Sequence, residues 1–358
     1  MNILMVNQSQ FGYSAGYYHY CVHLVDAGHT ITYIGNDQHL KKVELNGVRT
    51  IHIDEPKSIK WRLKFKEVID SVVREEKYDV ALLASFKGFS CLLGSFGNVP
   101  VIANVRTGDI SKNSIKRKLY NWLIRFESNR CNYIITLSDS LAKKLHLNKN
   151  KCDIVPLGSD VICDKDKNYE KLNILYVGSL NQRNIYLTVE GVAIFKKKYP
   201  QADVNYDIIG YGAEYEVQTL TQSIERNNLG GFVSFHGQKN YKELEPYFNY
   251  ANVGVAFVPM TPYYDCQPST KIFEYALSGI YSLATNTYEN KLIISSKNGI
   301  LHQDTADAFA EALERYYLMK RTSLNATEIR RTMADYEWGN IVAKKLIPIL
   351  TMVSKQKK

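Results

Sequence analysis

A short stretch late in the chain, QPSTKIFEYALSG at residues 267–279, places hydroxyl and ammonium groups at the start of an apolar helix. Pro268 and Ser269 are typical of a helix N-terminus. Ser269, Thr270 and Lys271 then fall in or just before the first turn, where backbone N–H groups have no partner within the helix and the helix dipole is positive. Such a turn binds phosphate and other anions well. The stretch therefore predicts an anion-binding site.

Glu274 adds a carboxylate to the same stretch. It follows Lys271 by three residues and so lies on much the same face of the predicted helix. One interpretation is an exposed helix residue that pairs with Lys271. The other is a carboxylate that faces a bound ligand, as titratable residues at functional sites do. The pattern of residues leaves both interpretations open.

Small residues follow several predicted strands. Gly16 lies in the loop after the first strand, Gly178 follows the first strand of the second half with Arg183 in the loop beyond it, and Gly237 ends a later strand. Without a Cβ atom, the backbone can come close to a bound group. The first strand is not followed by a complete GxGxxG turn, and the chain contains no P-loop, so a dinucleotide site is only weakly indicated.

The elements that must position these residues alternate between strands and helices. NILMV, HTITYIG, YDVALLA, PVIANV and CNYIITL are short apolar runs in the first half, and LNILYVGSL, VNYDIIGYG and NVGVAFVP are their counterparts in the second. Helical patterns between such runs indicate parallel sheets of βαβ units. We predict an α/β protein with two Rossmann-like, doubly wound domains that face each other across a cleft. The ligand site is expected there, at the carboxyl ends of the strands.

The domain boundaries follow from a lapse in this alternation. Residues 159–171, SDVICDKDKNYEK, are polar and charged. We predict an N-terminal domain at 1–160, a linker at 161–171, a C-terminal domain at 172–335, and a last helix at 336–358.

Composition restricts the class of protein. The chain has 358 residues, of which 45% are hydrophobic and 23% charged, enough to bury two sizeable cores. Its N-terminus has no basic segment followed by a long apolar one, and no apolar run is long enough to span a bilayer. We therefore expect a cytoplasmic protein. The six cysteines show neither CxxC nor metal-ligand spacing, so we expect reduced thiols.

The net charge of +9 is concentrated in two amphipathic segments. Such segments either lie on an anionic membrane or are the solvated faces of ordinary helices. Nucleic acid is not favoured as a partner, because no RNP-like aromatic stretch and no zinc-finger spacing accompanies them. The first segment, 57–66, carries Lys57, Lys60, Arg62, Lys64 and Lys66; the second, 112–125, carries Lys116, Arg117, Lys118 and Arg125 beside a face formed by Ile115, Leu119, Leu123 and Phe126.

Several motifs occur in the order of a known family. The opening residues MNILMVNQSQFGYSAGYYHYCVHLVDAGHTITYIG give a strand, a glycine-containing loop, a helix and a Gly-His before the second strand. CNYIITLSDSLAKKL, IVPLGSD, LYVGSLNQRN, YDIIGYG, VSFHGQ and ANVGVAFVP follow, then PSTKIFEYALSGIYSLATN and YEWGNIVAKKLIPIL. Over nearly its whole length the chain resembles the retaining glycosyltransferases of the GT-B fold, in the group 1, family 4-like set. In that family the last helix crosses back to the first domain.

The resemblance implies roles for the residues noted above. The donor is a nucleoside diphosphate sugar, which is a substrate, so no cofactor is expected. Arg183 and Lys271, as the catalytic pair, stabilise the leaving diphosphate, with the helix N-terminus at Ser269 and Thr270. Glu274 accepts hydrogen bonds from the ribose. The remaining donor-binding residues are Gly178, Gly237 beside His236, and Asp265; those on the acceptor side are Gly16, Arg106 and Asp109.

Two positions depart from the family's pattern. Cys266 stands where the first glutamate of a pair normally holds the sugar, and Asp265 is its neighbour. Ser179 stands where relatives often carry arginine. The tripeptide Asp164-Lys165-Asp166 resembles a metal-binding DxD motif, but it lies in the predicted linker and we interpret it as a solvated loop. We expect no metal site.

The predicted function is transfer of a sugar, with retention, to a saccharide or lipid-linked saccharide acceptor in surface polysaccharide or glycolipid assembly. Peripheral association with the inner face of an anionic membrane fits the basic segments. Two alternatives stay open. One is a nucleotide-sugar epimerase or hydrolase of the same fold, and the other is a non-catalytic nucleotide-sugar-binding subunit that has lost turnover with its first glutamate.

Overall fold

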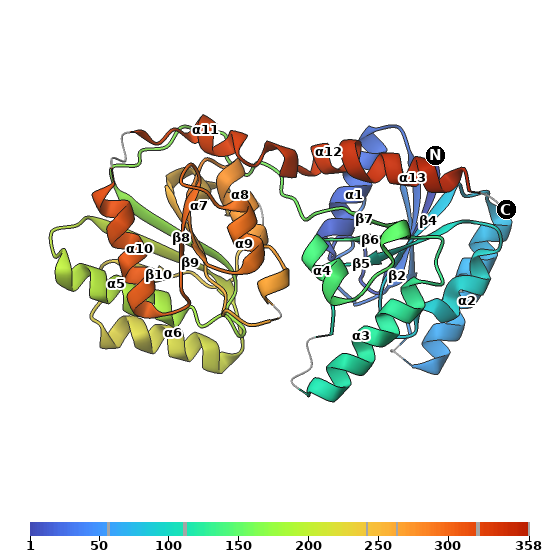
Figure 1. Cartoon of the computed structure of the whole chain (residues 1–358), viewed down its shortest axis with the longest axis horizontal. Coiled ribbons are helices and arrows are strands. Elements are labelled where there is room, and N and C mark those ends of the chain that lie inside the picture. The colour runs from blue at the N-terminus through green and yellow to red at the C-terminus, as the bar shows by residue number, and fades with distance from the viewer. Residues whose placement is uncertain (56–57, 110–112, 241–242, 263, 320–322, 357–358) are drawn as a thin grey trace. The chain divides into compact units, whose positions relative to one another are not determined.

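The computed structural model describes residues 1–358 except 56–57, 110–112, 241–242, 263, 320–322 and 357–358. The chain divides into two units (Figure 1): unit 1 is Met1–Leu157 with Trp338–Lys358, and unit 2 is Gly158–Glu337. Lys57 and Lys112, at the starts of the two basic segments, lie outside the described residues.

Unit 1 contains a parallel sheet with the strand order β3-β2-β1-β4-β5-β6-β7. The order reverses direction between β1 and β4, which is where doubly wound sheets bind ligands beyond their carboxyl edge. The strands are β1 (Asn2–Val6), β2 (Thr30–Asn36), β3 (Val48–Ile53), β4 (Val80–Ala84), β5 (Val101–Val105), β6 (Tyr133–Thr136) and β7 (Cys152–Ile154). The helices are α1 (Ala15–Asp26), α2 (Ile59–Glu75), α3 (Ser114–Ser128), α4 (Asp139–Lys144), α12 (Trp338–Ile341) and α13 (Ile347–Ser354), with a 3₁₀ segment at Phe89–Phe96 and a π-helical turn at Val342–Leu346.

Unit 2 repeats this plan with the strand order β10-β9-β8-β11-β12-β13, again parallel, and the direction reverses between β8 and β11. The strands are β8 (Leu172–Ser179), β9 (Val204–Tyr211), β10 (Val233–Phe235), β11 (Val253–Ala256), β12 (Tyr281–Thr285) and β13 (Gly299–His302). The helices are α5 (Tyr186–Lys198), α6 (Glu214–Arg226), α7 (Glu245–Tyr250), α8 (Thr270–Leu277), α9 (Tyr288–Ile293), α10 (Ala306–Leu318) and α11 (Ala326–Arg331).

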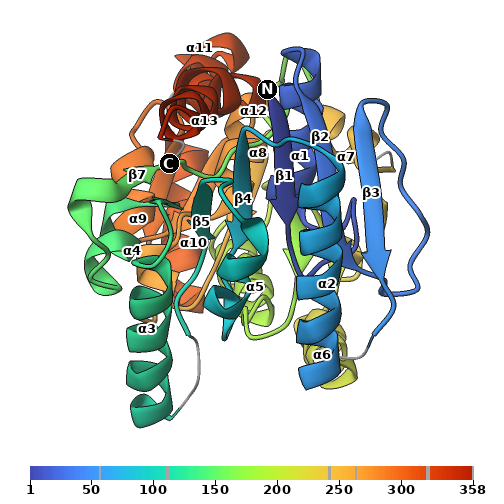
Figure 2. The same cartoon turned by 90° about the vertical axis from the view of Figure 1, so that its right-hand side faces the viewer.

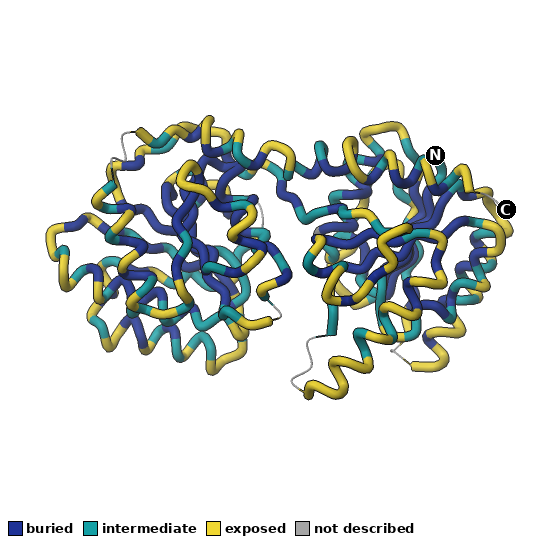
Figure 3. Tube along the Cα trace, in the orientation of Figure 1, coloured by how far each residue is buried: buried dark blue, intermediate teal, exposed yellow. Residues whose placement is uncertain are grey.

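The central strands are buried on both faces because helices cover both sides of each sheet (Figures 2 and 3). All five residues of β4, VALLA, and of β5, VIANV, are buried. Continuous apolar runs of this kind are typical of parallel sheets between helix layers. The sequence expectation of an α/β fold built from two doubly wound sheets is therefore confirmed.

The C-terminal segment is part of the core of unit 1. Trp338, Ile341, Leu346 and Leu350 are buried in the same apolar cluster as Ile3 of the central strand. The segment Trp338–Lys358 therefore contributes to the folding of the unit that the N-terminus begins.

The segment predicted as a linker, 161–171, belongs to unit 2 instead. Cys163 and Tyr169 are buried there, and the Tyr169 hydroxyl donates a hydrogen bond to the carbonyl of Gly279 at 2.6 Å. Its sequence is polar because the side chains between them, including Asp164 and Asp166, are exposed. All six cysteines are free thiols.

Among the helices of the described residues, none combines the length and the apolarity that crossing a lipid bilayer requires.

Candidate functional site

The stretch 267–279 forms helix α8 of unit 2, as its sequence predicts. Ser269 precedes the helix with extended backbone angles, φ −73° and ψ 119°, and its hydroxyl makes no capping hydrogen bond. Its own N–H donates to Oδ1 of Asn290 at 3.4 Å. Thr270 is the first helical residue. The first turn of α8 thus starts without the side-chain cap that commonly occupies the N–H groups of a helix start.

Lys271 is the buried cation of this turn. Its side chain is only 9% exposed, and its ammonium lies 5.3 Å from the centre of the Tyr176 ring. Burial, and next the charge of Arg183, lower the pKa of Lys271 to about 8, while Glu274 acts in the opposite direction. Within the described residues, no hydrogen bond or ion pair to another side chain holds the Lys271 ammonium. Burying a cation whose charge is only partly offset is costly, and a perturbed lysine of this kind is a candidate for a functional site.

Arg183 lies in the loop after β8, close enough to Lys271 to lower its pKa. The centre of its guanidinium is 4.2 Å from the centre of the Tyr264 ring. The Nε and Nη1 atoms are buried and have no hydrogen-bond partner in the part of the chain that the structure describes. Arg183 and Lys271 therefore form a pair of cations with unused donors, and such a pair suits an anion with more than one charge, such as a diphosphate.

Glycines bring the ends of three strands together beside these cations. Gly178, near the end of β8, has φ +152°, and a Cβ atom there would lie 2.6 Å from Cε and 2.8 Å from Nζ of Lys271. A Cβ on Gly210 would lie 2.0 Å from the carbonyl oxygen of Gly178. The Gly210 N–H donates to the carbonyl of Gly237 at 2.9 Å. The predicted residues Gly178 and Gly237 thus belong to one cluster at the carboxyl edge of the sheet.

Glu274 and Asp265 have different surroundings. Glu274 is half-buried on α8, one turn beyond Lys271. Asp265 is exposed, and its Oδ1 accepts a hydrogen bond from the N–H of Tyr288, the first residue of α9, at 2.7 Å. Asp265 therefore has a structural task in addition to the predicted one. Cys266, beside it, is buried.

His236, predicted as a neighbour of the base or as a packed strand-end residue, lies after β10. Its Nε2 is 2.6 Å from Oδ1 of Asp207, and its ring packs on Tyr247 with centroids 5.0 Å apart. Packing on Tyr247 and the hydrogen bond with Asp207 account for this side chain.

In unit 1 the structure places Gly16 directly beside Arg106. A Cβ on Gly16 would lie 2.8 Å from Cζ of Arg106, and the guanidinium donates to the Tyr20 hydroxyl at 3.1 Å. Asp109 has other partners: its carboxylate is 3.5 Å from the ammonium of Lys87, and its N–H donates to Asn121. Gly16 and Arg106 thus form one cluster, at the carboxyl ends of the strands, while Asp109 pairs with Lys87.

Sequence reasoning missed a hollow in unit 1. It has a volume of about 620 Å³ and lies where the chain leaves β1 and β4, beside the start of α2. A guanidinium N–H of Arg62 donates to the carbonyl of Lys87 at 3.0 Å across its wall. The topology could have indicated it, since β1 and β4 flank the point where the strand order reverses. The hollow is lined by Gln8, Ser58, Ile59, Trp61, Arg62, Phe86 and Lys87.

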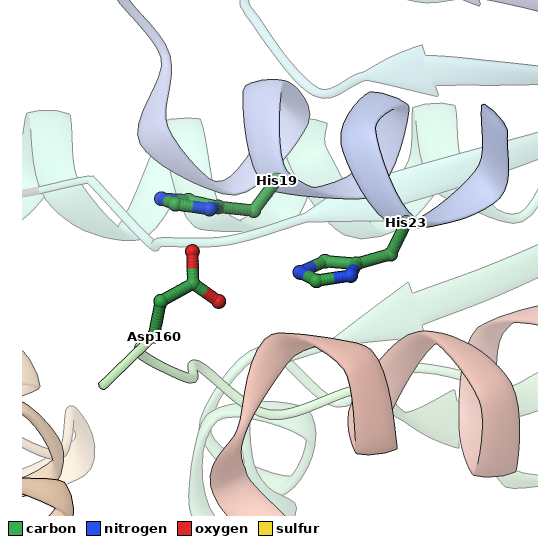
Figure 4. A group of neighbouring side chains, drawn as sticks. All are labelled: His19, His23 and Asp160. Atoms are coloured by element: carbon green, nitrogen blue, oxygen red, sulfur yellow. The ribbon is translucent and has the colours of Figure 1, made fainter. Parts of the chain in front are cut away.

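Two histidines on α1 also lie on one side of their helix. Figure 4 shows His19 and His23 one turn apart on this helix. The ring of His19 stacks on that of Trp338, with centroids 5.3 Å apart and planes 10° apart. Packing within unit 1 explains the position of this imidazole.

Comparison with known proteins gives one family match and several similar structures. Residues 12–161 match the model of Glycosyltransferase Family 4. No curated protein sequence matches the chain. A glycosyltransferase from Rickettsia africae has a similar structure, with a TM-score of 0.78, 15% identity and 99% of each chain covered.

Two further structures are similar. HepE from Anabaena, in complex with UDP and glucose, has a TM-score of 0.71 and 14% identity, with 98% of this chain and 100% of that one covered. WaaG, a glycosyltransferase involved in lipopolysaccharide biosynthesis, has a TM-score of 0.68 and 12% identity over 98% and 99% of the two chains. The chain has the GT-B fold of these glycosyltransferases, and its residues 12–161 resemble Glycosyltransferase Family 4.

Proposed function

We propose that this protein transfers a sugar, with retention, from a nucleoside diphosphate sugar to a saccharide or lipid-linked saccharide acceptor. The observation that carries the proposal is the pair of cations in unit 2. Lys271 is buried, and two donor atoms of Arg183, Nε and Nη1, have no hydrogen-bond partner among the described residues. The ligands named for HepE, UDP and glucose, are of the class that such a site suits.

In this proposal the two cations and the N-terminus of α8 bind the diphosphate. Charge grows on the β-phosphate as the glycosidic bond breaks, so donors fixed in a dry site stabilise the transition state more than the ground state. Glu274 accepts hydrogen bonds from the ribose hydroxyls. Gly178 and Gly237 keep the strand ends open for the nucleotide.

The acceptor binds in unit 1 under the same proposal. Arg106 lies against the Cα of Gly16, and Lys87 with Arg62 adds basic groups to the wall of the nearby hollow. Aromatic side chains line the hollow too, Trp61 and Phe86, a combination that suits a sugar bearing an anionic group. The assembly of surface polysaccharide or glycolipid fits these features and the role named for WaaG.

The chemical step in this proposal uses no metal ion and no enzymic nucleophile. With Lys271, Arg183 and the positive end of α8 on the diphosphate, no divalent ion is required to neutralise it. A phosphate oxygen of the leaving group deprotonates the acceptor hydroxyl on the face from which it departs, which retains the configuration. Activity that persists in excess EDTA supports this step, and loss that manganese or magnesium restores contradicts it.

The central test screens nucleoside diphosphate sugars for thermal stabilisation and then assays transfer with the tightest one. A ligand at a hundred times its Kd stabilises the folded state by about 2.7 kcal/mol. NMR of the product then gives its anomeric configuration, which must match that of the donor. Release of free sugar or a change of sugar without any acceptor product favours the hydrolase or epimerase. Nucleotide binding without any turnover favours the non-catalytic subunit.

A further inference from the structure

Helix α3 of unit 1 carries apolar side chains that no other part of its unit covers. The sequence predicts a face formed by Ile115, Leu119, Leu123 and Phe126; in the structure Leu123 is half-buried and Trp122 takes its place on the exposed face. The exposed fractions are 76% for Ile115, 57% for Leu119, 57% for Trp122 and 50% for Phe126.

These four side chains form one narrow stripe. The spacings of four, three and four residues place them within about 60° of one another around a helix with 3.6 residues per turn. The rings of Trp122 and Phe126 stack with centroids 5.6 Å apart and planes 13° apart. Packing within unit 1 is made by other residues of the helix, including Glu127 and Ser128, which are buried. The stripe is therefore additional to the face that holds the helix in the fold.

The rest of the exposed surface of α3 is basic. Lys118 and Arg125 flank the stripe on one side and Lys116 on the other, and all three are exposed and form no ion pair with a carboxylate among the described residues. The helix has a single acidic residue, Glu127. Its carboxylate accepts hydrogen bonds from the N–H groups of Gly88 and Ser90, so it does not offset the basic surface.

A second helix extends this pattern at the same end of unit 1. Helices α2 and α3 both start beyond the carboxyl ends of the strands, and both views of the fold show the two starts at one end of the unit (Figures 1 and 2). Near the start of α2, Ile59 and Leu63 are exposed beside Lys60. Figure 3 shows the first half of α3 exposed along its length.

We propose that the stripe of α3 is a membrane-docking surface whose occupant is the interface of a bilayer rich in anionic lipids. The apolar side chains enter the boundary between headgroups and acyl chains, where tryptophan is favoured. Lys116, Lys118 and Arg125 keep their charged ends among the anionic headgroups while their methylene stems lie along the apolar layer. The proposal rests on the proposed function in one respect: it places the hollow of unit 1 near a lipid-linked acceptor.

Tryptophan fluorescence provides a direct test. The chain has three tryptophans, and Trp61 and Trp338 are buried, so Trp122 is the exposed reporter. Vesicles of phosphatidylglycerol and phosphatidylcholine should shift the emission to shorter wavelength and protect it from iodide. Vesicles of phosphatidylcholine alone should have a much weaker effect. Binding should weaken steeply between low and physiological salt.

Variants separate the two contributions to binding. Replacing Lys118 and Arg125 by glutamine should weaken binding to anionic vesicles about 30-fold, since each basic side chain near such a surface contributes about fivefold. Ile115→Ser with Leu119→Ser should weaken it at least about tenfold, because the apolar contact is lost. The matched controls are Lys197→Gln and Leu318→Ser, exposed residues of unit 2, and both should bind vesicles like the parent.

Three results would overturn the proposal. The first is that the protein does not sediment with anionic vesicles at low salt, and the second is that the stripe variants bind vesicles as the parent does. The third is a dimer in sedimentation velocity that the same variants abolish, which would assign the stripe to a second copy of the chain. Thermal stabilisation by nucleotide-sugars is measured on the same variants. If it is retained while vesicle binding is lost, the docking surface and the donor site are separate. A protein that binds vesicles but no nucleotide would instead count against the proposed function alone.

Discussion

The ammonium of Lys271 lies against the backbone of Gly178. A Cβ atom at Gly178 would come within 2.8 Å of Nζ and 2.6 Å of Cε. Gly178 lies near the end of β8, and Lys271 lies in the first turn of α8. Because Gly178 has no side chain, the ammonium of Lys271 can occupy its buried position.

Gly178→Ala should therefore displace the Lys271 ammonium and weaken nucleoside diphosphate binding by about tenfold to a hundredfold, the range for losing a hydrogen bond to a charged group. The φ of +152° at Gly178 adds backbone strain. Isothermal titration calorimetry measures the loss. Gly230→Ala is the control, because no atom lies within 4 Å of its Cβ position and its φ is not positive. An unchanged affinity in Gly178→Ala would contradict the role of this contact.

Lys271→Met should make the protein more stable while it abolishes diphosphate binding. The pKa of Lys271 is about 8 in the folded protein against 10.5 for an ordinary lysine. At pH 7 the buried charge therefore lowers the free energy of unfolding by up to about 3 kcal/mol. The apolar side chain of methionine carries no charge and avoids this cost. Urea denaturation at pH 7 measures the gain, and Lys197→Met, on an exposed lysine, should leave the stability unchanged. A loss of stability in Lys271→Met would contradict this account.

The same pKa predicts the direction of a pH dependence. Between pH 8 and 10.5 the unfolded chain holds a proton on Lys271 that the folded chain has released, so the parent gains stability as the pH rises through this window. Affinity for a nucleoside diphosphate changes in the opposite direction, since the anion needs the protonated ammonium, and should fall by up to about tenfold for each pH unit above 8. In Lys271→Met, which should not bind the diphosphate, the slope of stability with pH should disappear; a slope that persists would assign it to another group.

The grouping of candidate residues at the start of α8 was predictable because these residues are close together in the sequence. Ser269, Thr270, Lys271 and Glu274 occupy one helical start, and a hydroxyl-rich turn with a lysine is typical of a helix N-terminus that binds an anion. The partnership of Lys271 with Gly178 was not predictable from spacing, since the two residues lie far apart in the sequence and only the sheet order brings β8 and α8 together.

For helix α3, the sequence predicts the helix but not whether its apolar face is covered. The period of its apolar residues predicts a helix and one apolar face, but a face that packs on a core and a face that stays uncovered have the same period. Only the packing of Glu127 and Ser128 into unit 1 shows that the stripe with Trp122 points away. The hollow beside α2 was missed for a related reason, because Trp61 and Lys87 meet there through the topology of the sheet.

Glu274→Ala tests the ribose role. The parent should bind a ribonucleoside diphosphate about tenfold or more tightly than its 2′-deoxy analogue, because a carboxylate that accepts from a hydroxyl contributes about 1.5–3 kcal/mol. The variant should bind both equally. Glu190→Ala, on a half-buried glutamate of α5, should keep the preference. If Glu274→Ala discriminates between the two nucleotides as the parent does, Glu274 does not contact the ribose.

Asp265 decides between the enzyme and the binding subunit, and its contact with α9 determines how the test must be designed. Because its Oδ1 accepts a hydrogen bond from the N–H of Tyr288, Asp265→Ala removes a helix cap and should cost about 1 kcal/mol of stability whether or not the sugar is held there.

Asp265→Asn keeps an oxygen for this hydrogen bond and removes only the charge. We expect Asp265→Asn to be as stable as the parent and to bind the bare nucleoside diphosphate equally well. We also expect it to lose the parent's preference for one nucleotide-sugar over its epimers, because Cys266 is a poor acceptor of sugar hydroxyls. Calorimetry with the nucleotide, the matching nucleotide-sugar and one epimer measures all three affinities. If the parent binds every nucleotide-sugar no better than the bare diphosphate and shows no turnover with any acceptor extract, the protein is a nucleotide-binding subunit. If Asp265→Asn keeps the preference for one nucleotide-sugar, the backbone of the loop before α8 holds the sugar instead.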